Sequence, residues 1–406
     1  MTGYDDPGAQ LRALRQQLGW SQEELANRAG LSTGVIKKIE GGGTARMETL
    51  RALARALGVH TVWFVRPGSP APTVDDGNDA VLADMRAAIL PPVGLDGRPL
   101  GTADHDDVHL PRLADAATEA NHIYHADRYD DLARLLPGLI QSAHYHVSAL
   151  DGPDHQRARR VRSALLGLAG RYLIQVRAHD LAMTALQRAA EDAAAIGDTP
   201  LAAAAVTCQA WAMLRQGRFA EVENLCARTA DTVEPRMSKA TPDELAAWGW
   251  LLMRASSAAI RNNRSEEASE YLALAETAAT RLGREHDLAG QYRFGPVTVA
   301  LLHPENAMIE GRPDLALQAL TRIPKGAGRT NPSSWNRASL ERARALVRVG
   351  DLDKATEVLT RLRRQHGQWL RYQQAARDVT TELVQARTRP LTPAQRDLVD
   401  FLNLTI

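Results

Sequence analysis

The sequence has few cysteines and no long apolar run. Its 406 residues include only two cysteines, Cys208 and Cys226, and no Cys-x-x-Cys motif, which argues against a disulfide framework and a structural zinc site. The first eight residues are polar and acidic, unlike a secretory signal, and no run of about 18 apolar residues that could span a membrane occurs. We therefore expect a cytoplasmic protein that neither enters a membrane nor is secreted.

Patterns typical of strands are also scarce. Aromatic residues make up 5% of the chain, and runs rich in Val, Ile and Thr with period-two alternation are hard to find. Ala, Leu, Arg, Glu and Gln dominate, and all five are good helix formers. The length exceeds that of one ordinary core, so the composition predicts an all-α chain of at least two domains, or a repeat array, with almost no sheet.

Signatures of catalysis are missing as well. The segment 325–330 contains glycines and basic residues but lacks the spacing of a phosphate-binding loop, and neither a Gly-x-Ser-x-Gly elbow nor a distinctive carboxylate pair occurs. Three histidine pairs have spacings that could suit a metal, and we interpret them as solvated or packing residues: His105 with His109, His122 with His125, and His144 with His146. We expect no enzymatic activity, no metal and no cofactor.

Positive charge is concentrated near the N-terminus. Residues 9–66 contain nine Lys or Arg and four Asp or Glu, whereas the whole chain has a net charge of only +1. The remaining residues are therefore slightly acidic. A short basic module on an acidic body is typical of a phosphate-binding domain joined to a separate effector domain.

Helix signals follow one another closely in this basic module. Residues 11–18 repeat apolar positions on one helical face and stop at Gly19, and Ser21 with Glu24 forms a capping box for a second helix that ends near Ala29. Gly30 suits a left-handed turn, and Ser32 suits the N-cap of a third helix. A fourth helix is predicted over 48–57, and Val59, Trp63 and Phe64 are expected to close the core.

The third predicted helix, residues 32–40, has two distinct faces. Val35, Ile36 and Ile39 form the stripe expected to face inward. The face left outward is polar and basic, and it consists of Thr33, Gly34, Lys37 and Lys38. Such a helix has the character needed to enter a DNA major groove.

These linked motifs resemble the XRE, or Cro/repressor-type, helix-turn-helix family over about 55 residues. The matching segments are 20–26, 30–32, 39–40 and 53–59. The resemblance implies that Gln22 and Ser32 contact phosphates and that Thr33, Gly34 and Lys38 lie where the family touches bases, with Lys37 beside them. Gly34 departs from the larger side chain usual at that place. Gly41–Gly43 would follow the DNA backbone, with Arg46 as a further phosphate contact. The alternative is a small helical bundle that mediates protein contacts.

The chain then changes character. A Pro- and Asp-rich stretch after Arg66 indicates a linker, followed by a short helix over 81–90 and irregular sequence to about Leu110. Four units follow from these shifts in composition: a helix-turn-helix domain over 9–66, a linker with a connecting helix over 67–110, a helical sensor and dimerisation domain over 111–387, and a C-terminal helix or tail over 388–406.

The helical body contains a weak repeat. Turn-like elements each place an apolar or small residue five positions on, and the pairs are Asp127 with Leu132, Arg177 with Ala182, Gly217 with Val222, Asn263 with Ala268, Gly311 with Ala316, and Gly350 with Ala355. The intervals exceed the about 34 residues of a tetratricopeptide repeat, so longer helices or loops are expected. The pattern predicts an α-solenoid of helix pairs behind a small five-helix helix-turn-helix domain.

This body resembles the tetratricopeptide-like sensor domains that follow helix-turn-helix domains in bacterial regulators, including those that read peptide signals. The segment Arg293–Pro296, followed by Val297 to Leu302, is similar to actinobacterial regulators of this layout. The first helix of each pair is expected to line the concave face, and Pro304 is expected to disturb the helix between His303 and Asn306. The candidate ligand residues are Trp211, Arg215, Trp248, Tyr292, Arg293, His303, Asn306 and Asn336. A tryptophan at helical spacing is more often a core residue than part of a ligand site, and this is the alternative for Trp211 and Trp248.

Together these observations favour a ligand-responsive, sequence-specific regulator that binds double-stranded DNA. We expect a homodimer that reads two half-sites and a body that senses a peptide or small-molecule effector. The alternative is a helical-repeat adaptor that binds a partner protein, with DNA binding secondary. A third hypothesis, an enzyme on a helical scaffold, has no motif to support it.

Overall fold

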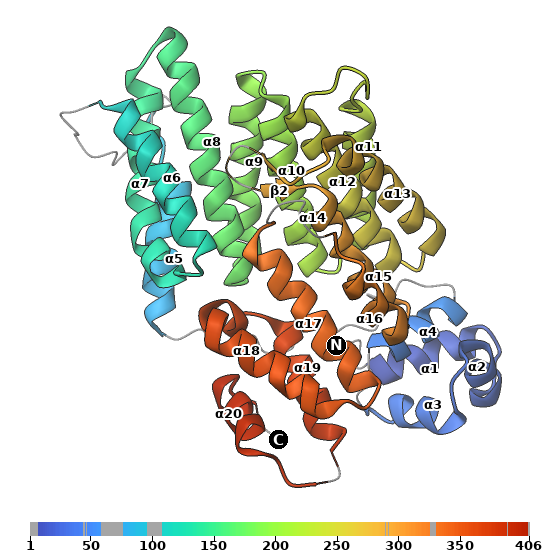
Figure 1. The fold of residues 1–406 in the computed structure, drawn as a ribbon. Helices are drawn as coiled ribbons and strands as arrows, with labels where there is room; N and C mark the ends of the chain where they lie inside the picture. Colours follow the sequence, from blue (N-terminus) through green and yellow to red (C-terminus); the bar gives the residue numbers. More distant parts are fainter. Residues whose placement is uncertain are drawn as a thin grey trace.

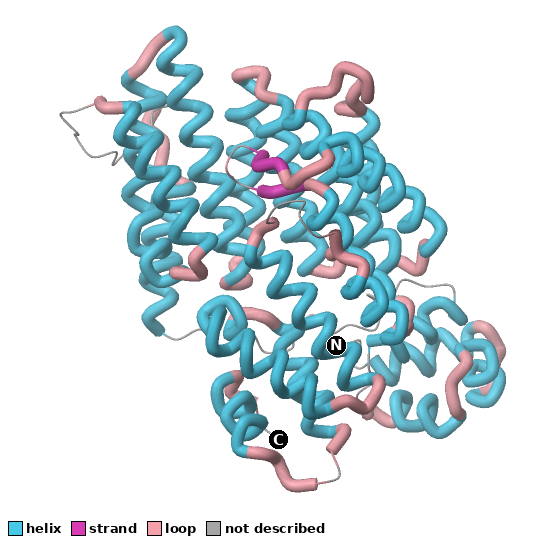
Figure 2. The backbone as a smooth tube through the Cα atoms, in the orientation of Figure 1, coloured by secondary structure: helices cyan, strands magenta, loops and turns pink. Residues whose placement is uncertain are grey.

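The computed structural model describes residues 7–43, 45, 47–57, 76–95, 108–288, 290, 292–324, 330–387 and 389–404. The predicted positions Arg46, Val59, Trp63 and Phe64 lie outside these residues, as do His105 and the boundary at residue 66. Within the described residues no helix is both long and apolar enough to cross a membrane. The architecture is helical throughout, apart from one short hairpin (Figure 2).

Four described helices form the N-terminal head. They are α1 (Pro7–Gln17), α2 (Gln22–Ala29), α3 (Thr33–Glu40) and α4 (Met47–Leu57). The predicted boundaries of the second helix are confirmed: the capping box between Ser21 and Glu24 is present, and Gly30 has a φ of 66°. The first helix begins earlier than predicted, at Pro7. Leu25, Ile36, Ile39 and Leu53 are at most 2% exposed, so the head has its own small core.

The body begins with a helix that the sequence places in the connecting segment. Helix α5 (Asp76–Ile89) packs against α7 (Tyr129–Ala149), and Met85 and Ile89 are completely buried there. Among the described residues six helix pairs follow, in which α7 is the second helix of the first pair. The pairs are α6 (Leu110–His125) with α7, α8 (Gly152–Gln175) with α9 (His179–Ala195), α10 (Thr199–Arg215) with α11 (Phe219–Thr232), α12 (Pro242–Arg261) with α13 (Ser265–Leu282), α15 (Leu302–Ile309) with α16 (Pro313–Thr321), and α17 (Pro332–Arg348) with α18 (Leu352–Arg371). Helices α19 (Gln374–Gln385) and α20 (Pro393–Phe401) complete the chain (Figure 1).

The repeated turns join the two helices of each pair in the same way. All six first positions have a positive φ, between 59° at Asp127 and 85° at Gly350. The next residue donates its N–H to a carbonyl five residues back, as in Arg218 to Met213 at 3.1 Å. This geometry ends a helix with its last carbonyls satisfied. The residue five positions on is at most 1% exposed in every pair, so the predicted repeat of close helix crossings is confirmed.

One short hairpin interrupts the helical array between α13 and α15. Strands β1 (His286–Leu288) and β2 (Tyr292–Phe294) pair antiparallel, and α14 (Pro296–Ala300) follows. Phe294 is fully buried against α12, where a Cβ on Gly249 would overlap its ring. The hairpin therefore fills the side of α12 that a regular helix pair would otherwise cover.

The array closes on itself. Residues of α18 and of the turn after it contact the first helices of the body: Gln373 donates to Gln175 at 3.0 Å, and the Tyr129 N–H donates to Gln368 at 3.0 Å. His366, which sits at a kink inside α18, lies 2.7 Å from Asp127. These pairs are about 200 residues apart or more in sequence, so the first helices of the pairs surround a common interior.

Candidate DNA interface and ligand cleft

The head positions its third helix through a buried charged group. Glu40, at the end of α3, is 4% exposed and accepts hydrogen bonds from Arg15 at 2.6 Å and from Gln22 at 2.7 Å. Burial alone would raise the pKa of Glu40, but the hydrogen bonds from Arg15 and Gln22 bring it below its usual range. The ion pair joins α1 to the end of α3, and the Gln22 amide adds α2, so α3 is fixed in orientation.

The outward face of α3 matches the predicted one. Ile36 and Ile39 point into the core, whereas Gly34, Lys37 and Lys38 are exposed and Thr33 is half-buried. Ser32 is the N-cap residue with extended backbone, but its hydroxyl makes no capping hydrogen bond. That hydroxyl is therefore not used by the helix that it precedes.

Gln22, unlike the exposed lysines of α3, is partly occupied by a hydrogen bond within the head. Its side chain is half-buried, and its amide nitrogen already donates to Glu40. The amide oxygen is left for a further partner. A phosphate contact by Gln22 remains a prediction, as do the contacts proposed for Ser32, Thr33, Gly34, Lys37 and Lys38.

The head also contacts the body. Arg51 on α4 donates from a terminal guanidinium nitrogen to the carbonyl of Ile309 at 3.3 Å. Ile309 is the last residue of α15. A hydrogen bond therefore joins the head to a helix that also borders two clefts of the body, described below.

The first cleft lies among α13, α14, α15 and α16 and is lined by two of the predicted ligand residues, His303 and Asn306. His303 lies 2.6 Å from Glu276 on α13, and Asn306 donates to Ser256 at 3.2 Å. The expected break at Pro304 is wrong, because α15 runs without interruption from Leu302 to Ile309. Pro304 is in the first turn of α15, where its missing N–H costs no helical hydrogen bond, and the break falls earlier, at Leu301.

The second cleft opens into the common interior, between α12 and α17. Its walls are Trp250, Met253 and Arg254 on α12, Leu302 and Glu305 on α15, and Ser334, Arg337 and Glu341 on α17. Trp211 on α10 is adjacent, because the Arg254 and Arg337 guanidinium carbons both lie 5.8 Å from the centre of its ring. This cleft is the one that brings cationic and aromatic side chains together.

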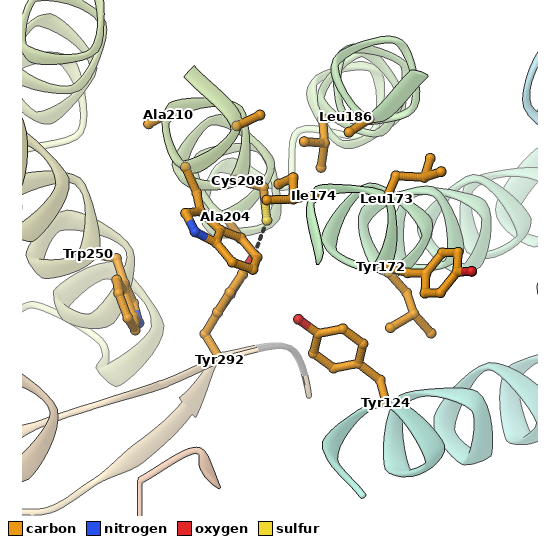
Figure 3. Close-up of a cluster of buried hydrophobic side chains, with 14 of the residues drawn as sticks. Tyr124, Tyr172, Leu173, Ile174, Leu186, Ala204, Cys208, Ala210, Trp250 and Tyr292 are labelled. Carbon is orange, nitrogen blue, oxygen red and sulfur yellow. Dashed lines mark hydrogen bonds between the residues drawn. The ribbon is translucent and has the colours of Figure 1, made fainter. Parts of the chain in front are cut away.

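Several predicted ligand residues lie in or beside this interior. Trp211 and Arg215 both lie on α10, and Arg215 is exposed. Tyr292 reaches inward from β2 to Cys208, with Tyr124 and Trp250 nearby (Figure 3). The Trp250 indole N–H donates to the carbonyl of Arg293 at 3.2 Å and so fixes the strand.

Two other predicted residues are buried and line neither cleft. Trp248 is 3% exposed and packs in the main core. Asn336 is 4% exposed, and its amide nitrogen has no hydrogen-bond partner among the described residues. The sequence does not distinguish Trp248 from Trp250, because both lie in one apolar stretch of α12.

Sequence reasoning missed Arg254, Arg337 and Gln373. A signal for Arg254 was present: it stands inside an otherwise apolar or small-residue run, and every residue from Leu245 to Ile260 is buried. A cation inside such a run requires a partner or a function. Arg337 and Gln373 carry no comparable signal, because their positions depend on the closure of the array.

Comparison with known proteins assigns the head. Residues 11–64 match the family model described as helix-turn-helix. The chain therefore has an N-terminal helix-turn-helix DNA-binding domain.

Two solved structures match most of this chain at low sequence identity and low TM-score. The crystal structure of PlcR from Bacillus thuringiensis in complex with the peptide PapR7 and DNA has a TM-score of 0.35 and 10% identity, and the match covers 78% of this chain and 95% of that one. The PrgX/iCF10 complex has a TM-score of 0.25 and 13% identity, with 99% and 98% of the two chains covered.

Proposed function

We propose that this protein is a ligand-responsive, sequence-specific transcriptional regulator. The helix-turn-helix match and the exposed basic face of α3 support a role in reading DNA. In this proposal Lys38 would donate to guanine in the major groove, and Thr33 would meet a thymine methyl. The observation that carries the proposal is that Lys37 and Lys38 are exposed on a helix whose orientation is fixed by the buried Arg15–Glu40 pair.

The body is the proposed sensor of a peptide or small molecule. Helix α15 supports this role, because Glu305 borders one cleft, His303 and Asn306 border the other, and the Ile309 carbonyl accepts the hydrogen bond from Arg51 of the head. A ligand that binds one arrangement of α15 better than another would shift the position of the head. By linkage, operator DNA would then change the affinity for the ligand by the same factor.

The proposal includes a homodimer. Two heads in a two-fold symmetric dimer would read half-sites about one helical turn, roughly 34 Å, apart. The target sequence would accordingly be an inverted repeat.

Selection from a pool of random duplexes tests DNA reading directly. The full chain should enrich an inverted repeat, and Lys38→Ala should relax the preference at one base pair per half-site by about 1–3 kcal/mol. Lys239→Ala, which removes an exposed lysine from the α11–α12 loop, is the matched control and should enrich the same sequence. Enrichment of no sequence would contradict the regulator and favour the adaptor, whereas enrichment of a single half-site would contradict the dimer.

A further inference from the structure

Three arginines converge on one indole ring in the interior of the body. The guanidinium carbons of Arg215, Arg254 and Arg337 each lie 5.8 Å from the centre of the Trp211 ring. The three arginines lie on α10, α12 and α17, each of which is the first helix of its pair. Arg215 is exposed, Arg337 is half-buried and Arg254 is only 6% exposed, so the group extends from the solvent into the interior. We call these three residues the arginine cluster.

Among the described residues, no carboxylate forms an ion pair with the arginine cluster. Within the part of the chain that the structure describes, Arg254 and Arg337 form neither a hydrogen bond nor an ion pair, and the buried Nε of Arg254 has no acceptor. Arg215 donates only to the neutral amide oxygen of Gln373, at 3.1 Å. Burial, together with the positive charge of Arg337, lowers the pKa of Arg254 to about 10. Unpaired buried cations of this kind are costly unless a ligand supplies the counter-charge.

The two nearby carboxylates form their ion pairs with other arginines. Glu305 pairs with Arg261, and Glu341 lies 3.9 Å from Arg344. Burial opposes the charged form of Glu305, but the positive charges of Arg261, Arg337 and Arg254 lower its pKa. Burial raises the pKa of Glu341, which weakens its charged form. Neither carboxylate forms an ion pair with the cluster.

The cleft beside the cluster is mixed in character. Trp250, Met253 and Leu302 give it apolar walls, and Ser257 and Ser334 add hydroxyl groups. The carboxylates of Glu305 and Glu341 also border it. A guanidinium presents a planar fork of N–H donors that matches a carboxylate or a phosphate. The combination suits an anionic group attached to an apolar body.

We propose that the cleft between α12 and α17 binds a small organic anion, whose carboxylate or phosphate is held by Arg254 and Arg337 beside Trp211. This proposal rests on the proposed function and gives the chemical class of its ligand. Arg215 guides the anion inward from its exposed position.

Calorimetric titration of the full chain at constant ionic strength tests the proposal. The probes are benzoate and phenyl phosphate, which carry the two anionic groups on the same apolar ring, and benzamide, the neutral counterpart of benzoate. At least one anion should bind about tenfold or more tightly than benzamide, and the tighter of the two identifies the group. Equal affinities for all three probes, or binding of none, would overturn the proposal.

Variants localise the site. Arg337→Gln should weaken the preferred anion about tenfold, whereas Arg342→Gln, an exposed arginine five residues later on α17, should leave its affinity unchanged. Arg254→Lys keeps the charge but loses the fork, so it should weaken binding less than Arg254→Gln. An unchanged affinity in Arg337→Gln, or equal losses in Arg337→Gln and Arg342→Gln, would overturn the proposal.

Folding and function are separated by two further readouts. The preferred anion should raise the melting temperatures of the unaltered chain and of Arg342→Gln, and it should raise that of Arg337→Gln by less. An equal rise in all three proteins would contradict the site. DNA selection uses none of these anions. Anion binding that leaves the DNA affinity unchanged would therefore refute the ligand response of the regulator but not the anion site. Enrichment of a DNA sequence by a chain that binds no anion would refute the anion site but not DNA reading.

Discussion

The head and the body distribute positive charge in opposite ways. In the head the buried carboxylate of Glu40 is paired with Arg15, and Lys37 and Lys38, which form no ion pair with any described residue, are on the surface. In the body the turn residues are paired on the surface, as Arg218 is with Glu221, and Arg254 and Arg337, which likewise form no ion pair with the described residues, are inside. Surface cations can meet a large polyanion such as DNA, whereas cations in an interior cleft can meet only a small one. The two proposed partners, DNA for the head and a small anion for the body, follow this contrast.

Loss of the buried pair should separate the two regions most strongly. Glu40→Ala leaves the half-buried Arg15 without its carboxylate partner and removes the acceptor of Gln22, which should cost about 1.5–3 kcal/mol and destabilise the small head while the body stays folded. Hydrogen exchange in the full chain checks this, with lost protection in α1 to α4 and retained protection in α8 to α12. Glu23→Ala, an exposed carboxylate of α2, is the control and should change neither region. Retained protection in the head of Glu40→Ala would contradict the role of the pair.

The two regions should also respond differently to acid. His144 is 4% exposed, accepts from Arg162 at Nδ1 and donates from Nε2 to the Ala88 carbonyl, which joins α7 to α5. Burial lowers the pKa of His144 to about 4, with Arg162 contributing, so only the unfolded state binds a proton between pH of about 6.5 and 4. The body should therefore lose stability as the pH falls through this window, by up to about 3 kcal/mol from this residue.

The head should lose stability later in the same titration. The lowered pKa of Glu40 means that its stabilisation is present above its usual value near 4.5 and is lost as the pH falls below it. Denaturant unfolding of the body at several pH values gives the slope of its free energy of unfolding against pH, and this slope should be smaller by one proton in His144→Gln. An unchanged slope would show that His144 does not titrate as described. Loss of the head at a higher pH than the body would contradict the order.

Packing around the hairpin offers a test inside the body. Gly249→Ala would place a Cβ against the ring of Phe294, which is completely buried, and should cost about 1–3 kcal/mol by overpacking. Gly138→Ala on α7 meets nothing within 4 Å, so it should be neutral or stabilising by up to about 1 kcal/mol. Melting temperatures of the two variants decide the matter. Similar shifts would contradict the close contact between α12 and β2.

The repeated turns should give the smallest effects. Gly217 has a φ of 77°, so Gly217→Ala should destabilise the body by about 1 kcal/mol, whereas Asn263, with a φ of 61°, should gain up to about 1 kcal/mol as Asn263→Gly. The opposite signs follow from the strain that a side chain adds in this conformation. Thermal melts that move in the same direction would show that backbone strain does not govern these turns.

The sequence predicts local structure well because its signals are local. Ser21, Gly30 and the six turn positions act through their own backbone geometry, and all of them have the expected role. Pro304 misled because proline is disruptive only after the first helical turn, and the start of α15 at Leu302 is not marked in the sequence. Helix boundaries near a proline are therefore the weak point of such a prediction.

The interior could not be predicted in the same way. Gln373 meets Gln175, and Arg337 meets Trp211, only because the array curves until its ends touch. That curvature sums small rotations over many helix pairs, and no single residue encodes it. The separation of Trp250, which lines the cleft, from Trp248, which does not, likewise depends on the rotation of α12 about its axis.

The central claim is that the lysines of α3 face DNA, and the salt dependence of duplex affinity tests it most directly. The affinity of the full chain should fall steeply with salt, by about 0.9 log units per neutralised phosphate for each log unit of salt concentration. Replacing Lys37 with Ala should reduce this slope by about one phosphate, whereas Lys239→Ala should leave it unchanged. A slope that is flat, or that both variants alter equally, would contradict the claim.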